Sequence, residues 1–393
     1  MRKPAILGGE PAFKEPLHVG RPNLPDKNVF WKYVDRIFDS RWLTNNGPLV
    51  REFQEKLEKF LHVKYCVPVC NGTIALELAE RALNFKDEVI LPSYTFVATA
   101  HSLQWQRITP VFADISKFDV TIDSESIKKV LTPNTTGIIG VHVYGHPCDY
   151  KKIGSIADTH NINVLYDAAH SFGCEVDNIP IANLGRASVF SFHATKFFNS
   201  FEGGAVTTND ESLAEQIRLM TNFGFNGFEK DTVDYLGING KMTEVSAAMG
   251  LAMLHSIESI RENNKQNFEK YREAITDIEG ISLIEPPQNL TKHNWQYVIV
   301  LVDREQFGID RDTLIQALEA ENVLARRYFY PGCHQMQPYR ECFPDYSLIL
   351  PNTDIISAKV ISFPTGQTIG QEEIIGIAEC LQSISHNRNH FHG

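Results

Sequence analysis

Residues 187–196 read ASVFSFHATK, a run of apolar and β-branched side chains that turns polar and ends at Lys196. This pattern is typical of a buried strand that leads into a loop or a helix. Because side chains alternate along a strand, Ser191 and His193 share one face, and Phe190 points to the other. The stretch therefore predicts a lysine just beyond the end of a buried strand, with a serine close before it.

A carboxylate follows a second predicted strand. Residues 163–170 read NVLYDAAH, so this strand ends at Asp167. A carboxylate in that position is costly to bury unless a cation or hydrogen-bond donors meet it. Asp167 is therefore either a structural side chain that caps the next helix or the partner of a bound cation.

A third junction is Asn71-Gly72-Thr73, directly after the predicted strand Tyr65–Val69. Backbone N–H groups and the positive end of the helix dipole bind phosphate at such a junction, and the Thr73 hydroxyl adds a donor. A plain helix N-cap is the alternative.

Short β-branched runs alternate with amphipathic stretches between residues 64 and 208. Further strands are expected at Glu88–Leu91, Pro110–Phe112 and Gly137–His142, each followed by a helix. This alternation predicts an α/β fold with a mostly parallel central sheet and helices on both faces. In such sheets ligands bind at the carboxyl ends of the strands, so the three junctions should meet at one edge.

A lysine and a carboxylate at strand ends, beside junctions that bind phosphate, are what pyridoxal phosphate requires. The lysine joins the cofactor aldehyde covalently, and Asp167 keeps the pyridine nitrogen protonated. Ser191 would donate to the same phosphate. Phe96, just beyond the strand at residues 88–91, would stack on the ring, with Tyr94 as the alternative. Taken singly, Lys196 could be a solvated cation and either aromatic residue a part of the core.

Composition argues against several other classes of protein. The 393 residues suggest about two domains and have the balance of an ordinary globular protein. The net charge of −11 argues against nucleic-acid binding, which needs clustered cations. No apolar run is long enough to span a bilayer, so we expect a cytoplasmic protein without a membrane segment. The seven cysteines are scattered, and Cys66 and Cys70 lack a second pair at zinc-site spacing. We therefore predict no metal site and interpret this pair as buried thiols.

The second half of the chain predicts a smaller α+β domain. A helix rich in small residues is expected at Thr243–Ser256, and after about residue 264 a further helix leads to an edge-type strand at Tyr297–Val302. Another helix follows at Asp312–Glu321. The expected ranges are an N-terminal segment at a domain or subunit boundary, a large cofactor-binding domain and a small C-terminal domain, at residues 1–45, 46–265 and 266–393.

Several motifs resemble those of the DegT/StrS family of sugar aminotransferases, over nearly the whole chain. They are LTNNGP (residues 43–48), DAAH (167–170), FSFHATK (190–196), NGKMTE (239–244) and RYFYPGCH (327–334). The resemblance implies the type I, aspartate aminotransferase-like fold of pyridoxal-phosphate enzymes. Together with GRPN (20–23), the motifs are most similar to those of enzymes that aminate C4 of dTDP-4-dehydro-6-deoxyglucose.

The resemblance also implies roles for single residues around the cofactor. It places Lys196 on the cofactor aldehyde, Asp167 on the pyridine nitrogen, Phe96 on the ring face and His170 beside the ring hydroxyl. The implied phosphate contacts come from the junction that contains Gly72, from Thr73 and Ser191, and from Asn239 of the partner subunit, so that a homodimer is the active unit. Many family members carry Gln where His170 stands. A dehydratase subgroup has histidine in place of the lysine, and Lys196 excludes that assignment.

The implied reaction is ping-pong transfer of the amino group from L-glutamate to a nucleotide-linked keto sugar, for a deoxyamino sugar such as those of O-antigens. Candidate contacts with the sugar nucleotide are Arg21, Lys241, Arg327, Tyr330 and His334, and a solvated surface side chain is the alternative for each cation. Many family members carry Arg where Lys241 stands. Two rival functions are amination at C3 of a dTDP-3-keto-6-deoxyhexose and a non-catalytic, regulatory role for a cofactor-binding paralogue. The intact lysine and aspartate count against the regulatory role.

Overall fold

The computed structural model describes residues 2–226, 232–342 and 350–391. The chain forms two compact units. The large unit consists of Pro22–Glu258 and Pro287–Asn294, and the small unit of Met1–Arg21, Ser259–Pro286 and Trp295–Gly393. The expected division into domains at residues 1–45, 46–265 and 266–393 stays a prediction.

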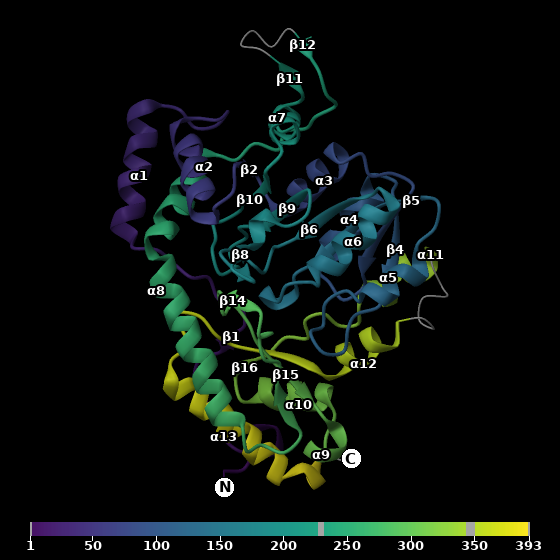
Figure 1. Ribbon diagram of the computed structural model, residues 1–393. Helices are drawn as coiled ribbons and strands as arrows, with labels where there is room; N and C mark the ends of the chain where they lie inside the picture. The colour runs from purple at the N-terminus through teal and green to yellow at the C-terminus, as the bar shows by residue number, and fades with distance from the viewer. Residues whose placement is uncertain (1, 227–231, 343–349, 392–393) are drawn as a thin grey trace. The chain divides into compact units, whose positions relative to one another are not determined.

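A seven-stranded sheet forms the centre of the large unit (Figure 1). β10 runs antiparallel to both of its neighbours, and the other strands pair in parallel. The predicted α/β fold with a mostly parallel sheet is confirmed. In spatial order the strands are β2 (Tyr65–Val69), β10 (Gly204–Thr208), β9 (Ala187–Ser191), β6 (Asn163–Asp167), β5 (Thr135–Val141), β3 (Glu88–Pro92) and β4 (Thr109–Ala113).

Strand β10 is not among the strands that the sequence predicted. The strand begins at Gly204, where an added Cβ would lie 2.7 Å from the carbonyl carbon of Asn71 and 2.9 Å from the nitrogen of Gly72. Glycine permits this close approach of two backbones. The inserted strand thereby brings the junction after β2 next to the end of β9.

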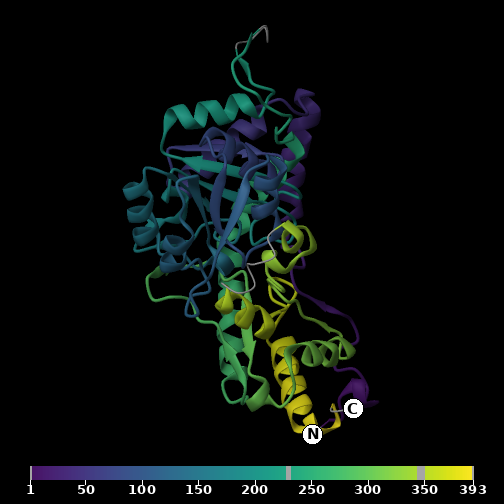
Figure 2. The same cartoon turned by 90° about the vertical axis from the view of Figure 1, so that its right-hand side faces the viewer.

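Helices surround the sheet, as the 90° view in Figure 2 shows. α3 packs against β9 and β10, α6 against β6, and α2 and α7 against β2. Side chains of Asp or Asn accept a hydrogen bond from the first turn of α1, α3, α5, α6 and α7, which satisfies donors that have no partner within the helix. The bounds are α1 (Lys27–Ser40), α2 (Pro48–Leu61), α3 (Gly72–Ala82), α4 (Val97–Trp105), α5 (Ser124–Val130), α6 (Tyr150–His160) and α7 (Glu211–Met220).

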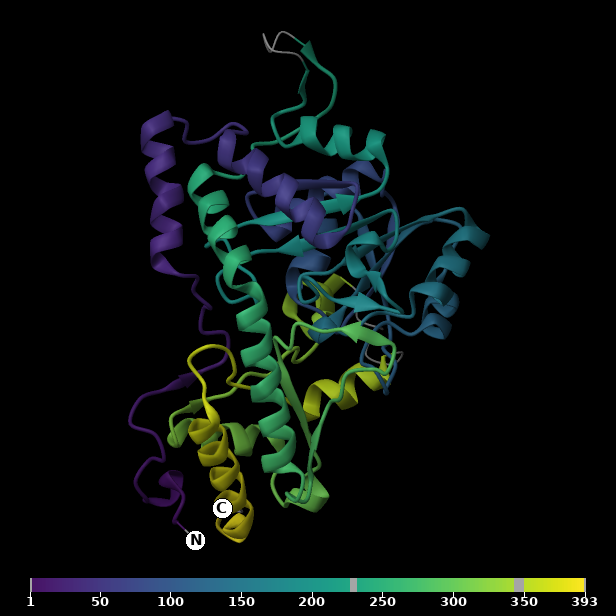
Figure 3. The same ribbon diagram turned by 60° about the vertical axis from the view of Figure 1, so that its left-hand side comes forward.

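The long helix α8 (Glu244–Ile275) continues well past the predicted end at Ser256 (Figure 3). No glycine or proline interrupts residues 257–275, so the two expected helices are one. At its start, Gly250 allows close packing, since a Cβ there would lie 2.5 Å from the ring of Phe53. Glu244 is buried and accepts hydrogen bonds from the backbone N–H groups of Leu49 and Val50, at 2.7 and 3.0 Å. A remote carboxylate thus caps α2.

A three-stranded antiparallel sheet forms the core of the small unit, in the order β13 (Ile281–Leu283), β15 (Val298–Val302), β17 (Val360–Phe363). The prediction that residues 297–302 form an edge-type strand is wrong, because β15 lies in the middle. Its unbroken apolar run is what a strand covered on both faces requires. The helices of this unit after α8 are α9 (Arg304–Phe307), α10 (Arg311–Ala320), α11 (Gln337–Cys342), α12 (Pro351–Lys359) and α13 (Gln371–His386).

The remaining strands are short. β1 (Leu17–His18) pairs in parallel with β16 (Val323–Leu324) in the small unit. The large unit carries β7 (Glu175–Val176), β8 (Ile179–Pro180) and β14 (Leu290–Lys292) in one sheet, and β11 (Phe225–Asn226) with β12 (Thr232–Val233) in another.

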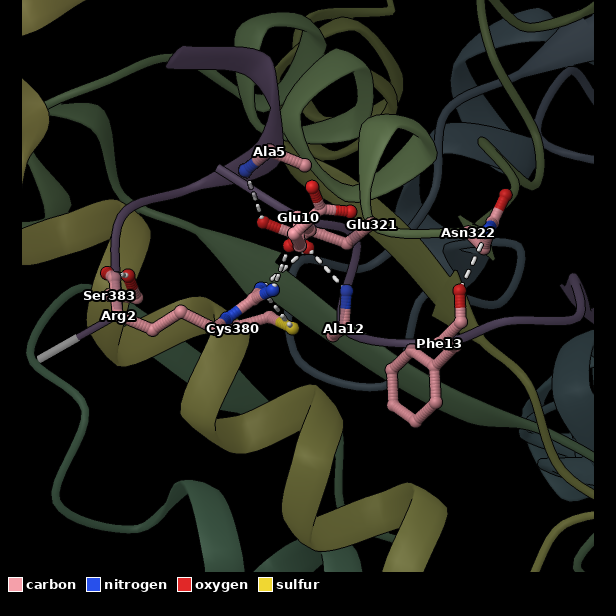
Figure 4. A network of polar contacts seen from close by, with 9 residues as sticks. All are labelled: Arg2, Ala5, Glu10, Ala12, Phe13, Glu321, Asn322, Cys380 and Ser383. Carbon is pink, nitrogen blue, oxygen red and sulfur yellow. Dashed lines mark hydrogen bonds and ion pairs between the residues drawn. The ribbon is translucent and has the colours of Figure 1, made fainter. Parts of the chain in front are cut away.

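The N-terminal segment is held by one buried carboxylate of the small unit (Figure 4). The side chain of Glu321 accepts hydrogen bonds from the backbone N–H groups of Ala5 at 2.7 Å and Ala12 at 2.8 Å, and it pairs with the guanidinium of Arg2 at 2.5 Å. Asn322 donates to a backbone carbonyl of the same segment at 2.7 Å. These contacts join the segment to the turn between α10 and β16.

Within the described ranges, no helix combines the length and the apolar character that crossing a membrane requires. The same residues contain no group of three or more His, Cys, Asp or Glu side chains placed to hold a metal ion. Cys66 is buried and Cys70 is partly buried, and both thiols are free.

Candidate active site

Asp167 is a buried carboxylate at the end of the central strand β6. Its Oδ1 accepts from the backbone N–H of Ala169 at 3.1 Å, and its Oδ2 accepts from the hydroxyl of Thr99 at 2.8 Å. Burial raises the pKa of this carboxyl above its ordinary value, although both hydrogen bonds and the charge of Lys196 act in the opposite direction. Both of these donors are neutral, so a cation brought to this carboxylate would be strongly favoured.

Lys196 lies in the turn after β9 and is partly buried. Its backbone N–H donates to the carbonyl of His193 at 2.9 Å. Burial lowers the pKa of the ammonium group from 10.5 to about 8, and the charge of Asp167 opposes this shift. About a tenth of Lys196 is therefore the neutral amine at pH 7, far more than for an ordinary lysine, and this is the form that attacks an aldehyde.

The start of α3 lies against the end of β9. The side chain of Asn71 accepts from the backbone N–H of Ile74 at 2.8 Å, as an N-cap does. A Cβ added at Gly72 would lie 2.8 Å from the Cβ of Ser191 and 3.2 Å from its hydroxyl oxygen. The structure thus brings Gly72 and Ser191 together at a helix N-terminus, which is suited to bind phosphate. Thr73, the next residue, is exposed.

His170 comes three residues after Asp167 and is buried. Its Nδ1 accepts a hydrogen bond from the backbone N–H of Tyr144 at 3.1 Å. That hydrogen bond leaves the ring proton of a neutral imidazole on Nε2, which makes Nε2 a donor. Burial, and secondarily the charge of Lys196, lowers the pKa of His170 well below its ordinary value. His170 is therefore a neutral donor at physiological pH.

The two aromatic candidates differ in exposure. Phe96 immediately precedes α4 and is 57 % exposed, so a flat ring has access to its face. Tyr94 is fully buried, and its hydroxyl lies 2.6 Å from that of Tyr144. Tyr94 is therefore a core residue, whereas Phe96 is available for stacking.

The motif at residues 239–244 runs beside the end of β2. The backbone of Lys241 pairs with that of Val69, and its ammonium nitrogen lies 4.7 Å from the centre of the Phe223 ring. Asn239 is exposed, and its backbone pairs with that of Asn222. The assignment of Asn239 to the phosphate site of a partner subunit stays a prediction.

The other four candidates for sugar-nucleotide contacts belong to the small unit. Arg21 and Arg327 each come three residues after the last paired residue of β1 and β16, which are His18 and Leu324. Because the two strands are parallel, both arginines follow the same end of the pair.

Arg327 and Tyr330 contact each other, whereas His334 lies in the interior. The guanidinium carbon of Arg327 is 5.1 Å from the centre of the Tyr330 ring, and its Nη1 donates to Asp312 at 3.1 Å. His334 is buried, with Nε2 at 3.1 Å from Oδ1 of Asp354. The alternative of a solvated surface side chain is wrong for His334.

Thr99 is the residue of this site that the sequence did not predict. It lies one turn into α4, three residues after Phe96, and its hydroxyl reaches Asp167 on a strand distant in the sequence. A threonine in an apolar helix gave no signal by itself, since such hydroxyls usually bond to their own helix.

The sequence pattern of the DegT/DnrJ/EryC1/StrS aminotransferase family matches residues 26–382. The chain belongs to this family. Pyridoxal phosphate is the family's cofactor, and the residues described above fit it: a buried carboxylate bound by neutral donors, a glycine–serine cradle at a helix N-terminus, and a partly buried lysine with a lowered pKa.

Several members of the family are similar over their full length. A dTDP-4-amino-4,6-dideoxy-D-glucose transaminase of Shigella dysenteriae is 38% identical over 371 residues, covering 94% of this chain and 100% of that protein. The Escherichia coli protein of the same name is 36% identical, over 92% and 97%. The crystal structure of DesI in the presence of its TDP-sugar product has a TM-score of 0.93 and 42% identity, over 98% of this chain and 97% of that one. The type I fold expected for the chain is thereby confirmed.

Proposed function

We propose that this aminotransferase moves the amino group of L-glutamate to C4 of dTDP-4-dehydro-6-deoxyglucose and so forms dTDP-4-amino-4,6-dideoxyglucose. This choice of substrate rests on the full-length similarity to transaminases named for this amino sugar, at 38% and 36% identity. The arrangement of Lys196, Asp167 and the Gly72–Ser191 cradle supports the chemistry.

Each residue of the site has a distinct task in this proposal. When bound, pyridoxal phosphate supplies a ring that withdraws the electrons left behind as a proton leaves the carbon bearing the amino group. Asp167 holds a proton on the ring nitrogen through a charge-assisted hydrogen bond. Lys196 would hold the aldehyde carbon of the cofactor, and the free amine of its Nζ would accept the proton that leaves the substrate carbon. A pKa of about 8 suits an amine that must accept and return a proton near neutral pH.

The remaining residues bind and orient the cofactor and the sugar nucleotide. Gly72, Thr73 and Ser191 bind the phosphate, Phe96 covers the ring, and His170 donates from Nε2 to the ring hydroxyl. The diphosphate of the sugar nucleotide needs cations, for which we propose Arg21, Lys241 and Arg327, with Tyr330 and His334 also contacting this substrate. The parallel pairing of β1 with β16 supports a joint role of the two arginines, because it directs both past the same strand ends. A homodimer completed by Asn239, a cytoplasmic location and a role in O-antigen or related glycan synthesis belong to the same proposal.

The test is NMR of the amino sugar formed from dTDP-4-dehydro-6-deoxyglucose and L-glutamate. The proposal expects nitrogen on C4, shown by the chemical shift and couplings of H4. Nitrogen on C3 after incubation with a 3-keto isomer, without a C4 product from the 4-keto sugar, would favour the rival aminotransferase. A yellow protein that L-glutamate does not bleach would instead favour a regulatory paralogue. A GDP-linked 4-keto sugar is the comparison substrate, since a GDP-perosamine synthase of Caulobacter vibrioides is 32% identical.

A further inference from the structure

Another buried carboxyl of the large unit lies in the helix that begins at the phosphate cradle. Glu80 of α3 is fully buried. Its Oε1 lies 2.6 Å from the hydroxyl oxygen of Ser102, and its Oε2 accepts from the side-chain amide of Gln106 at 2.7 Å. Neither of these partners is a cation. A carboxyl group in such surroundings is costly to keep ionised.

The contacts of Ser102 continue toward Asp167. The Ser102 hydroxyl lies 3.2 Å from the backbone carbonyl oxygen of Thr99, and the Thr99 hydroxyl donates to Oδ2 of Asp167 at 2.8 Å. The Thr99 hydroxyl also lies 2.9 Å from that of Thr95, which can donate to it. Polar contacts therefore lead from Glu80 through Ser102 to the backbone carbonyl of Thr99, and from the Thr99 hydroxyl to Asp167, so that the covalent frame of Thr99 joins the two halves of this path.

This path joins the two ends of the cofactor site. α3 begins at Gly72, which lies against Ser191, and the path from the same helix ends at the carboxylate of β6. The phosphate and the ring nitrogen belong to one small molecule, so the distance between them varies only within narrow limits. Contacts that hold α3, α4 and β6 together therefore determine whether both ends can bind at once.

Ser102 has two short contacts but only one hydroxyl hydrogen, and this favours a protonated Glu80. Ser102 carries one hydroxyl hydrogen, so it can donate either to an ionised Glu80 or to the carbonyl of Thr99. If Glu80 is protonated, it donates to Ser102, Ser102 donates to Thr99, and both short contacts are hydrogen bonds. Burial raises the pKa of Glu80 to about 8, opposed by Ser102 and Gln106.

Negative charges around Glu80 raise its pKa, as burial does. The negative charges of Glu77 on the same helix and of Asp167 on β6 raise the pKa of Glu80 further. The guanidinium of Arg81, the next residue along the helix, donates to the side-chain oxygen of Gln106 at 3.2 Å. With a pKa of about 8, most of Glu80 is the neutral acid at pH 7, and the anion becomes the main form as the solution turns alkaline.

We propose that protonated Glu80 is a positioning residue for Asp167, acting through Ser102 and Thr99. Ionisation of Glu80 turns the Ser102 hydroxyl away from the Thr99 carbonyl, loosens that turn of α4, and adds a second negative charge near Asp167. The inference rests on the proposed cofactor site, but it concerns only how this chain holds its own carboxylate.

The experiment measures binding of pyridoxal phosphate to the apo-protein by absorbance between pH 6.5 and 9.5. It also measures the pKa of the bound chromophore, which a merely structural role of Glu80 would leave unchanged. Lys196 loses its proton over the same interval in wild type and variants alike, so affinity is compared with that of Glu80→Gln, and wild type should bind more weakly than this variant as pH rises through about 8. Glu80→Gln keeps the shape and cannot ionise, so it should bind within about twofold of wild type at pH 7 and lose the alkaline weakening. Glu77→Gln, on the same helix, is the matched control and should retain it.

Three further variants test the path itself. Thr99→Val removes the donor to a charged acceptor and should weaken cofactor binding roughly ten- to a hundredfold, whereas Thr99→Ser should restore it. Ser102→Ala should bind more weakly than wild type at pH 7, and its affinity should respond less to the ionisation of Glu80. It also tests the link without deleting a large buried side chain.

Two results would overturn the proposal. One is an alkaline weakening in Glu80→Gln equal to that of wild type, and the other is unchanged cofactor binding and chromophore pKa in both Thr99→Val and Ser102→Ala. Borohydride reduction keeps these outcomes separate from a failure of the proposed site. A wild type that attaches the cofactor to Lys196 leaves that site intact whatever the variants do. Absence of cofactor binding in the wild type overturns both proposals together.

Discussion

Replacing Asp167 with asparagine should separate the stability of the protein from its function. Asparagine keeps the shape of the side chain and one acceptor oxygen, which can retain the backbone N–H of Ala169 at 3.1 Å. Its amide group then faces Thr99, whose hydroxyl can turn to the carbonyl of Phe96, 3.2 Å away, and accept instead. The folded protein therefore loses little. The cofactor loses a charge-assisted hydrogen bond, worth roughly 1.5–3 kcal/mol, or about ten- to a hundredfold in affinity.

The effect of this substitution on stability has a definite sign. Burial raises the folded-state pKa of Asp167 above the unfolded value, so the folded wild type binds more protons, and its stability falls as pH rises through that interval. The amide of the variant does not titrate and escapes this loss. Urea unfolding of the apo-protein at pH 7 should show Asp167→Asn at least as stable as wild type, while the rate of amino transfer from L-glutamate falls more than cofactor affinity does. A less stable apo-variant with near-wild-type rates would refute the reasoning and leave Asp167 a structural residue.

Further outcomes concern separate features of the chain. Lys196→Ala should abolish turnover while the fold remains, and borohydride should label the wild type on the peptide containing Lys196; label on another lysine would contradict the assignment. Mixed dimers of inactive Lys196→Ala and inactive Asn239→Ala chains should recover activity, because one of the two sites inherits neither defect, whereas verified chain exchange without recovery would argue against a shared site. Glu321→Ala leaves two backbone N–H groups of the N-terminal segment without their acceptor and should lower the free energy of unfolding by roughly 2–4 kcal/mol, with Glu321→Gln less affected. Burial lowers the pKa of His142 to about 3 and of His146 to about 4. The unfolded chain therefore binds more protons below about pH 6.5, and stability should fall on acidification by roughly 1.4 kcal/mol per pH unit for each histidine, a slope that His142→Asn should reduce in urea unfolding.

Local patterns predicted those parts of the fold in which one segment determines its own structure. The strands that end at Val69, Asp167 and Ser191 were expected within one residue of their observed ends, because apolar runs bounded by polar junctions are read directly from the chain. The same reading placed Lys196 just beyond a buried strand. The partners of these segments were harder to predict. β15 has the composition of a strand, but its place between β13 and β17 depends on segments at both ends of the small unit.

The sequence by itself determined the type of each junction and the chemistry of its side chains: a lysine after β9, a carboxylate after β6, and a glycine at the start of α3. Tertiary structure alone decided which of them meet. Insertion of β10 between β2 and β9 brings Gly72 against Ser191, since only two glycines allow the backbones so close. The Thr99 hydroxyl on α4 reaches Asp167 at the end of β6, and Ser102 on the same helix contacts Glu80. Such contacts join residues far apart in the chain, and burial, which shifts the pKa values of Lys196 and Asp167, exists only once the whole sheet has formed.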